Sequence, residues 1–568
     1  MRAFSVPLGV VRRRPRSKSE GLLTMTQFLT MTQLRENRVV IAHVYTATAA
    51  IVVGALFGAA QGLSRASAVG APGWFDYYRI LTMHGVLMAL VFTTFFICGL
   101  SLFVTYRSIP RERKMTLGWL GYWVMLIGVL MAAVEILAGN ATVLYTFYAP
   151  LKASPWFYIG AALLIIGTWV VTAEIFENVL WYRRNNPGVP VPLPAFTAAA
   201  TFLMWWIATL GVVGEMYLLI PWAFGWTPGI NVMLTRMLFW YFGHPLVYFW
   251  IMGAYICWYN IVPKFYKGNL FSDGLTRLTF IMLLLLSTPV GIHHEFMEPG
   301  ISSTWKMLHT VTTYGVAIPS FITAFAIFAS FEMAARRLGR RGFWQTVSSL
   351  PWNNPAFCGP AYGMLLFILG GFGGLVNASY SMDMLVHNTI WIVGHFHVTV
   401  GGPVALTFLG IAYWMIPKLT GRALWKPEWA LWQTRSWFIG MLVMSMSMHI
   451  AGLMGAPRRT AEVSYLGSAP NEWLAYNLLA AAGGLVLLTS ILIFAAVAIG
   501  TLVANEKTED MTVEFAQPLP GSEPAPALLQ SLFRWGAVAL VLAVLAYAGP
   551  LLEMLHHPVF LAPGMRTW

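Results

Sequence analysis

The chain has 568 residues, of which 58% are hydrophobic and only 10% charged, and its mean hydropathy is +0.66. This composition excludes a string of soluble domains and predicts one large all-α integral membrane domain. The net charge of +13 does not indicate nucleic-acid binding, because the basic residues form short clusters between apolar runs. Cys98, Cys257 and Cys358 are far apart, so neither a disulfide framework nor a thiolate metal site is expected.

Thirteen apolar runs are long enough to cross a bilayer, which takes about 20 residues. They fall at 39–62, 80–106, 117–138, 156–181, 196–222, 232–262, 275–298, 304–335, 357–377, 384–416, 430–455, 473–503 and 530–555.

These runs divide the chain into four expected segments. A basic cytoplasmic leader covers 1–38, the main transmembrane domain of twelve helices 39–503, a cytoplasmic linker 504–529, and a thirteenth helix with an outer tail 530–568. The leader contains Arg12-Arg13-Arg14-Pro15-Arg16. It does not predict a cleaved signal peptide, because the run behind it has full membrane length. Met25 and Met31 are further candidates for the first residue.

The charges between the runs set the expected orientation. Basic residues cluster in every second connection, at 107–114, 183–184, 264–267, 336–341 and 418–426. This bias places the N-terminus inside and the C-terminus outside a bacterial plasma membrane. The opposite loops carry few basic residues, and the pair Arg458-Arg459 is the clear exception. An adjacent arginine pair on the outer side suggests an anionic partner there.

Histidines gather at one expected depth in the membrane. In Gly394-His395-Phe396-His397 the two histidines leave opposite faces of a helix, which turns about 100° per residue, so one helix can ligate two metal centres. Four more histidines are expected in the same outer half: His84, His244, His293 and His294. Lipid cannot satisfy imidazole nitrogens, and packing does not explain six of them at one level.

Imidazole suits iron, copper and zinc, and the scattered cysteines argue against an iron–sulfur cluster. Six imidazoles divide into three for copper or another non-haem metal, two for a six-coordinate haem, and one for a five-coordinate haem open to a small ligand. In Gly243-His244-Pro245-Leu246-Val247-Tyr248, the tyrosine follows His244 by four residues. The Tyr248 phenol is therefore expected beside the His244 imidazole.

Together these motifs resemble subunit I of the haem-copper oxygen reductases, from about Arg38 to the C-terminus. The resemblance implies a bundle that encloses two haems and one copper. By it, His84 and His397 would be the axial ligands of a low-spin haem and His395 the ligand of a high-spin haem. The implied copper ligands are His244, His293 and His294. Tyr248 would be covalently linked to His244, and both would be catalytic.

The chain departs from the mitochondrial-like branch of these enzymes at two places. In both it is more similar to the B-family, the cytochrome c oxidases best known from thermophilic bacteria. Leu246 replaces a glutamate of that branch, and the loop 107–116 lacks its Asn/Asp-bearing proton entry. By this resemblance the low-spin haem is expected to be b-type and the high-spin haem a- or o-type. Arg458 and Arg459 would pair with haem propionates, while Asp383 and His387 would position the haems and store a pumped proton.

Hydroxyl groups predict a proton path from the inner surface to Tyr248. Tyr255 and Tyr259 follow Tyr248 by seven and eleven residues on one helical face, and Ser320 and Thr323 lie three residues apart on the eighth run. The path is similar to the B-family route. That family has another hydroxyl one turn beyond Thr323, where this chain has Ala326, so a water is expected to bridge there.

The resemblance implies a terminal respiratory oxidase that reduces O2 to water at the high-spin haem-copper centre and pumps protons. Electrons would come from cytochrome c through a second subunit with a two-copper centre, because this chain lacks the thiolates for one. A small membrane subunit and membrane lipid are further expected partners. A quinol oxidase stays open as an alternative. Tyr248 argues against a nitric oxide reductase of the same superfamily, and a histidine-relay proton transporter would bind no haem.

Overall fold

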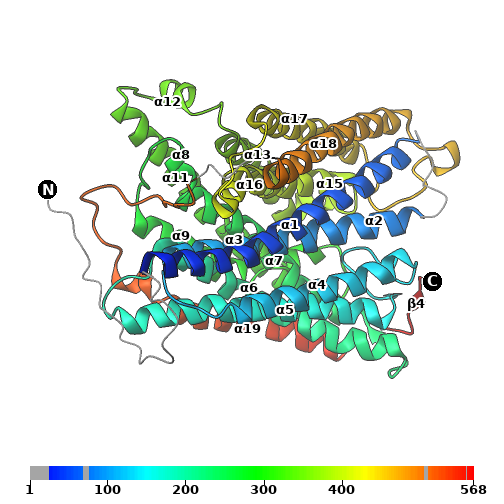
Figure 1. The fold of residues 1–568 in the computed structure, drawn as a ribbon. Coiled ribbons are helices and arrows are strands. Elements are labelled where there is room, and N and C mark those ends of the chain that lie inside the picture. Colours follow the sequence, from blue (N-terminus) through cyan, green and yellow to red (C-terminus); the bar gives the residue numbers. More distant parts are fainter. Residues whose placement is uncertain (1–24, 68–75, 505–509, 558–559, 568) are drawn as a thin grey trace.

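Long helices make up almost the whole of the computed structural model, which describes residues 25–67, 76–504, 510–557 and 560–567. Within those residues, thirteen helical stretches are long and apolar enough to cross a membrane. The predicted all-α class and number of spans are therefore confirmed. The helices run roughly from left to right in Figure 1, where α1 begins on the left and β4 lies on the right. The arginine-rich part of the predicted leader, 12–16, lies outside the described residues.

The α-helices are α1 Met25–Arg65, α2 Tyr77–Gly85, α3 Thr93–Ser108, α4 Thr116–Leu137, α5 Pro155–Asn185, α6 Leu193–Phe224, α7 Val232–Asn260, α8 Val262–Phe265, α9 Asp273–Ser287, α10 Ser303–Gly315, α11 Ala317–Arg337, α12 Phe343–Ser349, α13 Pro355–Ala378, α14 Tyr380–Val386, α15 Ile390–Phe396, α16 Thr407–Thr420, α17 Pro427–Leu453, α18 Asn471–Val503 and α19 Leu532–Leu555. Two π-helical segments are η1 Val86–Phe92 and η3 His397–Leu406, and three 3-10 turns are η2 Ile292–Glu295, η4 Tyr465–Gly467 and η5 Ala527–Gln530.

Polar side chains at helix starts explain several of these boundaries. Asn231 precedes α7 and accepts a hydrogen bond from the backbone N–H of Leu234 at 3.0 Å. Ser272 caps α9 in the same way, accepting from the N–H of Leu275 at 3.1 Å. Each cap satisfies one of the N–H groups that a first turn leaves without a partner. The sequence therefore sets where α7 begins, the helix that carries His244, and where α9 begins, the helix that leads to His293 and His294.

The run around His395 and His397 is not the single α-helix that the sequence suggested. It divides into α14, a break in which Asn388 has a φ of +61°, the short α15, the π-helical η3 and then α16. His395 ends α15 and His397 begins η3. His84 likewise lies one residue from the end of α2, directly before the π-helical η1. Such wide turns are rare in α-helices and occur often at functional sites.

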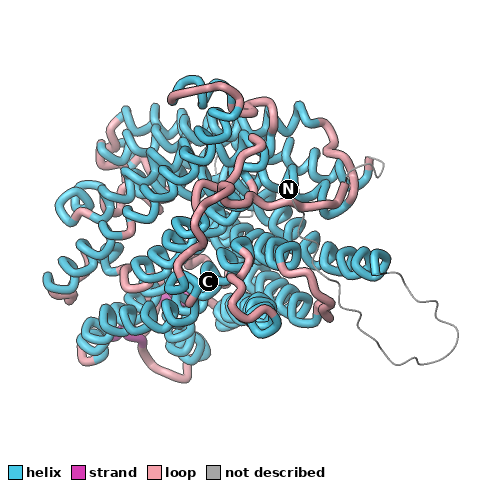
Figure 2. The backbone as a smooth tube through the Cα atoms, turned by 90° about the vertical axis from the view of Figure 1, so that its left-hand side faces the viewer, coloured by secondary structure: helices cyan, strands magenta, loops and turns pink. Residues whose placement is uncertain are grey.

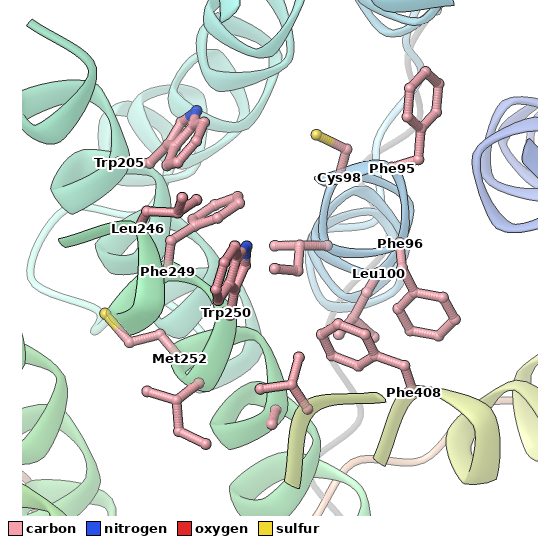
Figure 3. Close-up of a cluster of buried hydrophobic side chains, with 14 of the residues drawn as sticks. Phe95, Phe96, Cys98, Leu100, Trp205, Leu246, Phe249, Trp250, Met252 and Phe408 are labelled. Atoms are coloured by element: carbon pink, nitrogen blue, oxygen red, sulfur yellow. The ribbon is translucent and has the colours of Figure 1, made fainter. Parts of the chain in front are cut away.

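Helix α7 lies in the interior, in contact with α3, α6, α9, α16 and α19. Figure 3 shows part of the surrounding core, with side chains from α3, α6, α7 and α16. Trp205 of α6 stacks on Phe249 of α7 at a ring separation of 4.1 Å, and Phe96 of α3 stacks on Phe408 of α16 at 4.4 Å. Offset aromatic stacks of this kind add to the burial of large apolar surfaces. The helix that carries His244 and Tyr248 is therefore held by packing on several sides.

Within the described residues the strands are short and pair with the C-terminal tail; Figure 1 labels β4 at the right-hand end of the bundle, and Figure 2 draws the strands in magenta. Strand β1 (Leu151–Lys152) pairs in parallel with β4 (Met565–Arg566), and β2 (Ile230–Asn231) pairs antiparallel with β3 (Leu561–Ala562). At the opposite end, the connection from α18 to α19 packs against α7, because the N–H of Ala516 donates to Asn260 O at 2.7 Å. The thirteenth helix is thereby tied to the bundle at both ends.

Candidate metal centres

Three histidines meet in the interior. His244 comes from α7, whereas His293 and His294 lie in η2, beyond the end of α9 at Ser287. One imidazole nitrogen of each lies within 4.8 Å of the others. Nδ1 of His244 is 3.0 Å from Nε2 of His294, while Nε2 of His244 is buried without a hydrogen-bond partner. Three converging imidazoles fit a copper ion, for which imidazole is a suitable ligand.

The residues around this cluster fix the orientation of its imidazoles. The Thr313 hydroxyl donates to His309 O at 2.5 Å, so its oxygen accepts from Nδ1 of His293 at 3.0 Å. Nδ1 of His293 therefore carries the proton, which leaves Nε2 with a free lone pair. Nδ1 of His309 accepts from the N–H groups of Gly291 and Ile292 at 3.2 and 3.4 Å. His309 thus holds the turn that carries the histidine pair.

Two aromatic rings complete the cluster. Trp240 stacks on His294 with ring centroids 3.9 Å apart and an interplanar angle of 11°. The Tyr248 ring lies 4.7 Å from the His244 ring at 60°. Pro245 follows His244 inside α7 and removes one backbone hydrogen bond of that helix. The predicted proximity of Tyr248 to His244 is thus present in the structure.

A second pair of imidazoles faces across a cavity. His84 and His397 lie with ring centroids 6.1 Å apart and an interplanar angle of only 12°. Nδ1 of His84 is 2.8 Å from Gly54 O, and Nδ1 of His397 is 2.8 Å from Val393 O. A carbonyl only accepts, so both Nδ1 atoms carry protons and both Nε2 atoms keep lone pairs. This wide, nearly parallel arrangement fits an iron ligated from two sides.

The cavity between these histidines measures about 220 Å³ and extends to the loop that follows α17. Arg458 and Arg459 line it together with Arg65 at the end of α1. Arg65 donates to Pro457 O at 3.0 Å and to Thr460 O at 3.1 Å, and so holds the loop that carries the arginine pair. Arg65 was not predicted from the sequence to belong to this site, although it lies beside a connection in which basic residues are scarce.

His395 faces away from this cavity, as its spacing from His397 predicted. A Cβ built on Gly373 of α13 would lie 2.5 Å from Nδ1 of His395, so only a glycine leaves room for this ring. Nδ1 of His395 is buried without a hydrogen-bond partner. Trp391 lies parallel to the ring at 5.8 Å and contacts His449 at 4.9 Å. An imidazole with a buried, unused nitrogen fits a metal ligand, and the described part of the chain places no second axial histidine beside it.

Charged groups gather near the end of the cavity that Arg458 and Arg459 line. Nδ1 of His387 lies 2.9 Å from Oδ2 of the buried Asp383. The Arg458 guanidinium donates to Asn388 Oδ1 at 2.9 Å. Burial and the neighbouring Arg459 lower the pKa of Arg458 to about 10, so it still carries its charge at neutral pH. A partly buried arginine pair fits carboxylate groups of a bound cofactor.

The predicted hydroxyl path is partly formed. Tyr255 donates to Ser320 Oγ at 3.4 Å, and Tyr259 donates to Thr323 Oγ1 at 3.0 Å. Both tyrosines are fully buried. Within the described residues no hydrogen bond joins Tyr248 directly to Tyr255, so a bridging group is needed between them. Thr279 of α9 also contacts Tyr259 and was not anticipated from the sequence.

The fold and these centres define a multi-pass membrane oxidoreductase that holds haem iron and copper. The family model described as cytochrome c and quinol oxidase polypeptide I matches residues 38–486. The chain belongs to this family, as subunit I of a terminal oxidase.

Known oxidase subunits are similar to this chain over most of its length. The cytochrome c oxidase subunit 1 of Thermus thermophilus is 41% identical over 545 residues, which cover 91% of this chain and 95% of that protein. The haem-copper oxidase subunit I+III of Aeropyrum pernix is 28% identical over 72% of this chain and 50% of its own length. The solved cryo-EM structure of a haem-copper terminal oxidase dimer superposes with a TM-score of 0.89 at 37% identity, covering 94% of this chain and 95% of that one.

Proposed function

We propose that this chain is the catalytic subunit of a cytochrome c oxidase, in which His244, His293 and His294 hold copper and His395 holds the iron of a high-spin haem. The observation that carries the proposal is the cluster of three imidazoles within 4.8 Å, with the Tyr248 ring 4.7 Å from that of His244. When bound, the haems and copper would supply electron transfer and O2 binding, and four electrons and four protons would reduce one O2 to two waters. The 41% identity to a cytochrome c oxidase subunit 1 supports cytochrome c as the electron donor.

His84 and His397 are proposed to hold a low-spin haem in the cavity that both line. With both axial positions filled, that haem would pass electrons without binding O2. Arg458 and Arg459 would pair with its propionates at the outer end, and the arrangement of Asp383 and His387 supports a proton-storing pair beside them. The proposed haem types are b at this site and a or o at His395, by resemblance to the B-family.

Tyr248 is proposed to hold the last proton and to donate it, with an electron, during O–O cleavage. Nδ1 of His244 faces His294, so the partnerless Nε2 is the atom available for a covalent bond to Tyr248. Protons would return to Tyr248 from the inner surface along Tyr255, Tyr259, Ser320 and Thr323. The enzyme is also proposed to pump protons across the membrane. Their two observed hydrogen bonds support this path.

The comparisons and the charge distribution support a proposed assembly and orientation. A second subunit with a two-copper centre is proposed as the electron entry, and a small membrane subunit and lipid as further partners. The basic loops support a bacterial plasma membrane, with the N-terminus in the cytoplasm and the C-terminus outside. The leader 1–38, the catalytic domain 39–503, the linker 504–529 and the last helix with its tail 530–568 are proposed as the functional segments.

The test measures three activities of the purified complex of both subunits. These are O2 consumption with reduced cytochrome c, O2 consumption with a quinol, and reduction of nitric oxide. Rapid turnover with cytochrome c is expected, and Tyr248→Phe should abolish it while leaving haem and copper contents unchanged. Turnover with quinol alone would make the enzyme a quinol oxidase. Efficient reduction of nitric oxide without O2 turnover, or full O2 turnover by Tyr248→Phe, would overturn the assignment.

A further inference from the structure

The hydroxyl of Tyr259 has two partners in the structure. It lies 3.0 Å from Oγ1 of Thr323 on α11 and 3.4 Å from Oγ1 of Thr279 on α9. All three side chains are essentially inaccessible to solvent. Tyr259 therefore sits at a junction between two helices, of which only the α11 side follows from the spacing of its residues in the sequence.

The hydrogen atoms at this junction permit only one donation by Tyr259 at a time. The Thr323 hydroxyl donates to Pro319 O at 2.9 Å, and the Thr279 hydroxyl donates to Leu275 O at 2.9 Å. Both threonine oxygens are thus acceptors, and a phenol has a single hydrogen to offer. A relay through Tyr259 needs one partner that delivers a proton and another that removes one. The two threonines can divide these roles.

Hydroxyl groups continue inward from the junction without a gap along α9, whereas α11 lacks one at position 326 and next presents one at the buried Ser330. One turn beyond Thr323, α11 presents Ala326, which is fully buried and has no hydroxyl. Thr276 lies three residues from Thr279 on α9, is also fully buried, and donates to Ser272 O at 2.9 Å. Residues three apart on a helix are neighbours on its surface. The partly exposed Ser272 begins this helix, so α9 leads from the junction to the surface in two turns.

We propose that Thr279 is a proton-relay residue that joins Tyr259 to the inner surface along α9, in place of the hydroxyl that position 326 lacks. This inference rests on the proposed oxidase function and on a path through Tyr255. In each transfer, a proton from water reaches the Thr279 oxygen by way of Thr276. The Thr279 hydrogen moves to the Tyr259 oxygen, the Tyr259 hydrogen moves to the Thr323 oxygen, and the Thr323 hydrogen moves on to Tyr255. Every O–H bond that breaks is replaced by one that forms, with no redox change.

The test uses the complete oxidase complex with the variant Thr279→Val, which keeps the shape of the side chain and removes its hydroxyl. O2 turnover is expected to fall about tenfold, less than for loss of a direct acid–base group because a water can partly replace a hydroxyl. Proton uptake after a single oxidation should slow equally, and the solvent deuterium isotope effect should rise. Thr279→Ser should restore all three quantities, and the haem spectra and the KM for cytochrome c should not change.

Two further variants separate a relay from a packing effect. Thr172→Val removes a buried hydroxyl of α5 that donates only to Thr168 O at 2.8 Å, and it should behave as the unmodified enzyme. Adding Ala326→Thr to Thr279→Val places a hydroxyl on α11 instead and should recover turnover. If Thr279→Ser is as slow as Thr279→Val and the isotope effect is unchanged, the residue only packs and the proposal is wrong.

Tyr255→Phe distinguishes failure of this proposal from failure of the proposed function. If Tyr255→Phe is slow and Thr279→Val has normal turnover, the path exists but does not use α9. If both variants have normal turnover, protons reach the site by another route. The path through Tyr255 and the α9 relay are then both wrong, while the oxidase assignment is unaffected. If the unmodified complex does not consume O2, the proposed function itself is wrong.

Discussion

Replacing Gly58 of α1 by alanine should weaken the low-spin haem site selectively. A Cβ at this position would lie 2.7 Å from both Nδ1 and Cε1 of His84, well inside the ordinary contact range that begins at 3.4 Å. The ring cannot retreat without losing its hydrogen bond to Gly54 O at 2.8 Å. That bond contributes about 1 kcal/mol and overpacking costs about 1–3 kcal/mol. The sum of about 2–4 kcal/mol corresponds to a roughly 30- to 700-fold loss of haem affinity.

The matched control is Gly62→Ala, one turn further along α1 in the same cavity. Its Cβ would meet nothing closer than Ala481 Cα at 3.8 Å, so binding should be unchanged. The assay is the ratio of low-spin haem to protein in purified complex, from reduced optical spectra after dilution and washing. Gly58→Ala should lose the low-spin band and keep the carbon monoxide-reactive band. A full low-spin haem content in Gly58→Ala would refute the proposed position of the His84 ring.

His309→Leu should lower the copper content and leave the low-spin haem band intact, because the N–H groups of Gly291 and Ile292 lose their acceptor; equal copper by metal analysis would contradict this. Removal of copper by a chelator should abolish O2 turnover, and re-addition of copper should restore it, whereas His293→Asn should not respond to added copper. Because burial and Arg459 lower the pKa of Arg458 only to about 10, this guanidinium stays charged at lower pH and discharges as the pH rises through that value. The low-spin haem spectrum should therefore be constant until the pH approaches about 10, and an earlier change in a titration would show that Arg458 does not control it.

The spans and the groups of histidines could be predicted because they depend on simple periodic properties. Thirteen apolar runs of membrane length gave thirteen helical stretches. Alternating helix direction placed histidines that are far apart in sequence at one depth. The opposed pair His84 and His397 and the cluster around His244 follow from that depth and from helical spacing.

The local backbone at these sites could not be predicted from spacing. The π-helical segments after His84 and from His397 onward, and the separate turn that carries His293, depend on packing between helices. Residues that act through another helix were missed for the same reason. His309 holds a turn that precedes it by seventeen residues, and Thr279 meets Tyr259 only when α9 packs on α7. A single sequence gives no signal for such pairs.

The most direct test of the central claim is the reduced-minus-oxidised optical spectrum of the purified complex, with and without carbon monoxide, together with iron and copper analysis of this subunit. Two haems are predicted, of which one shifts with carbon monoxide, and one copper should be present beside them. Haem with additional iron and no copper would contradict the copper site formed by His244 and its partners. A complex without haem would contradict the whole account.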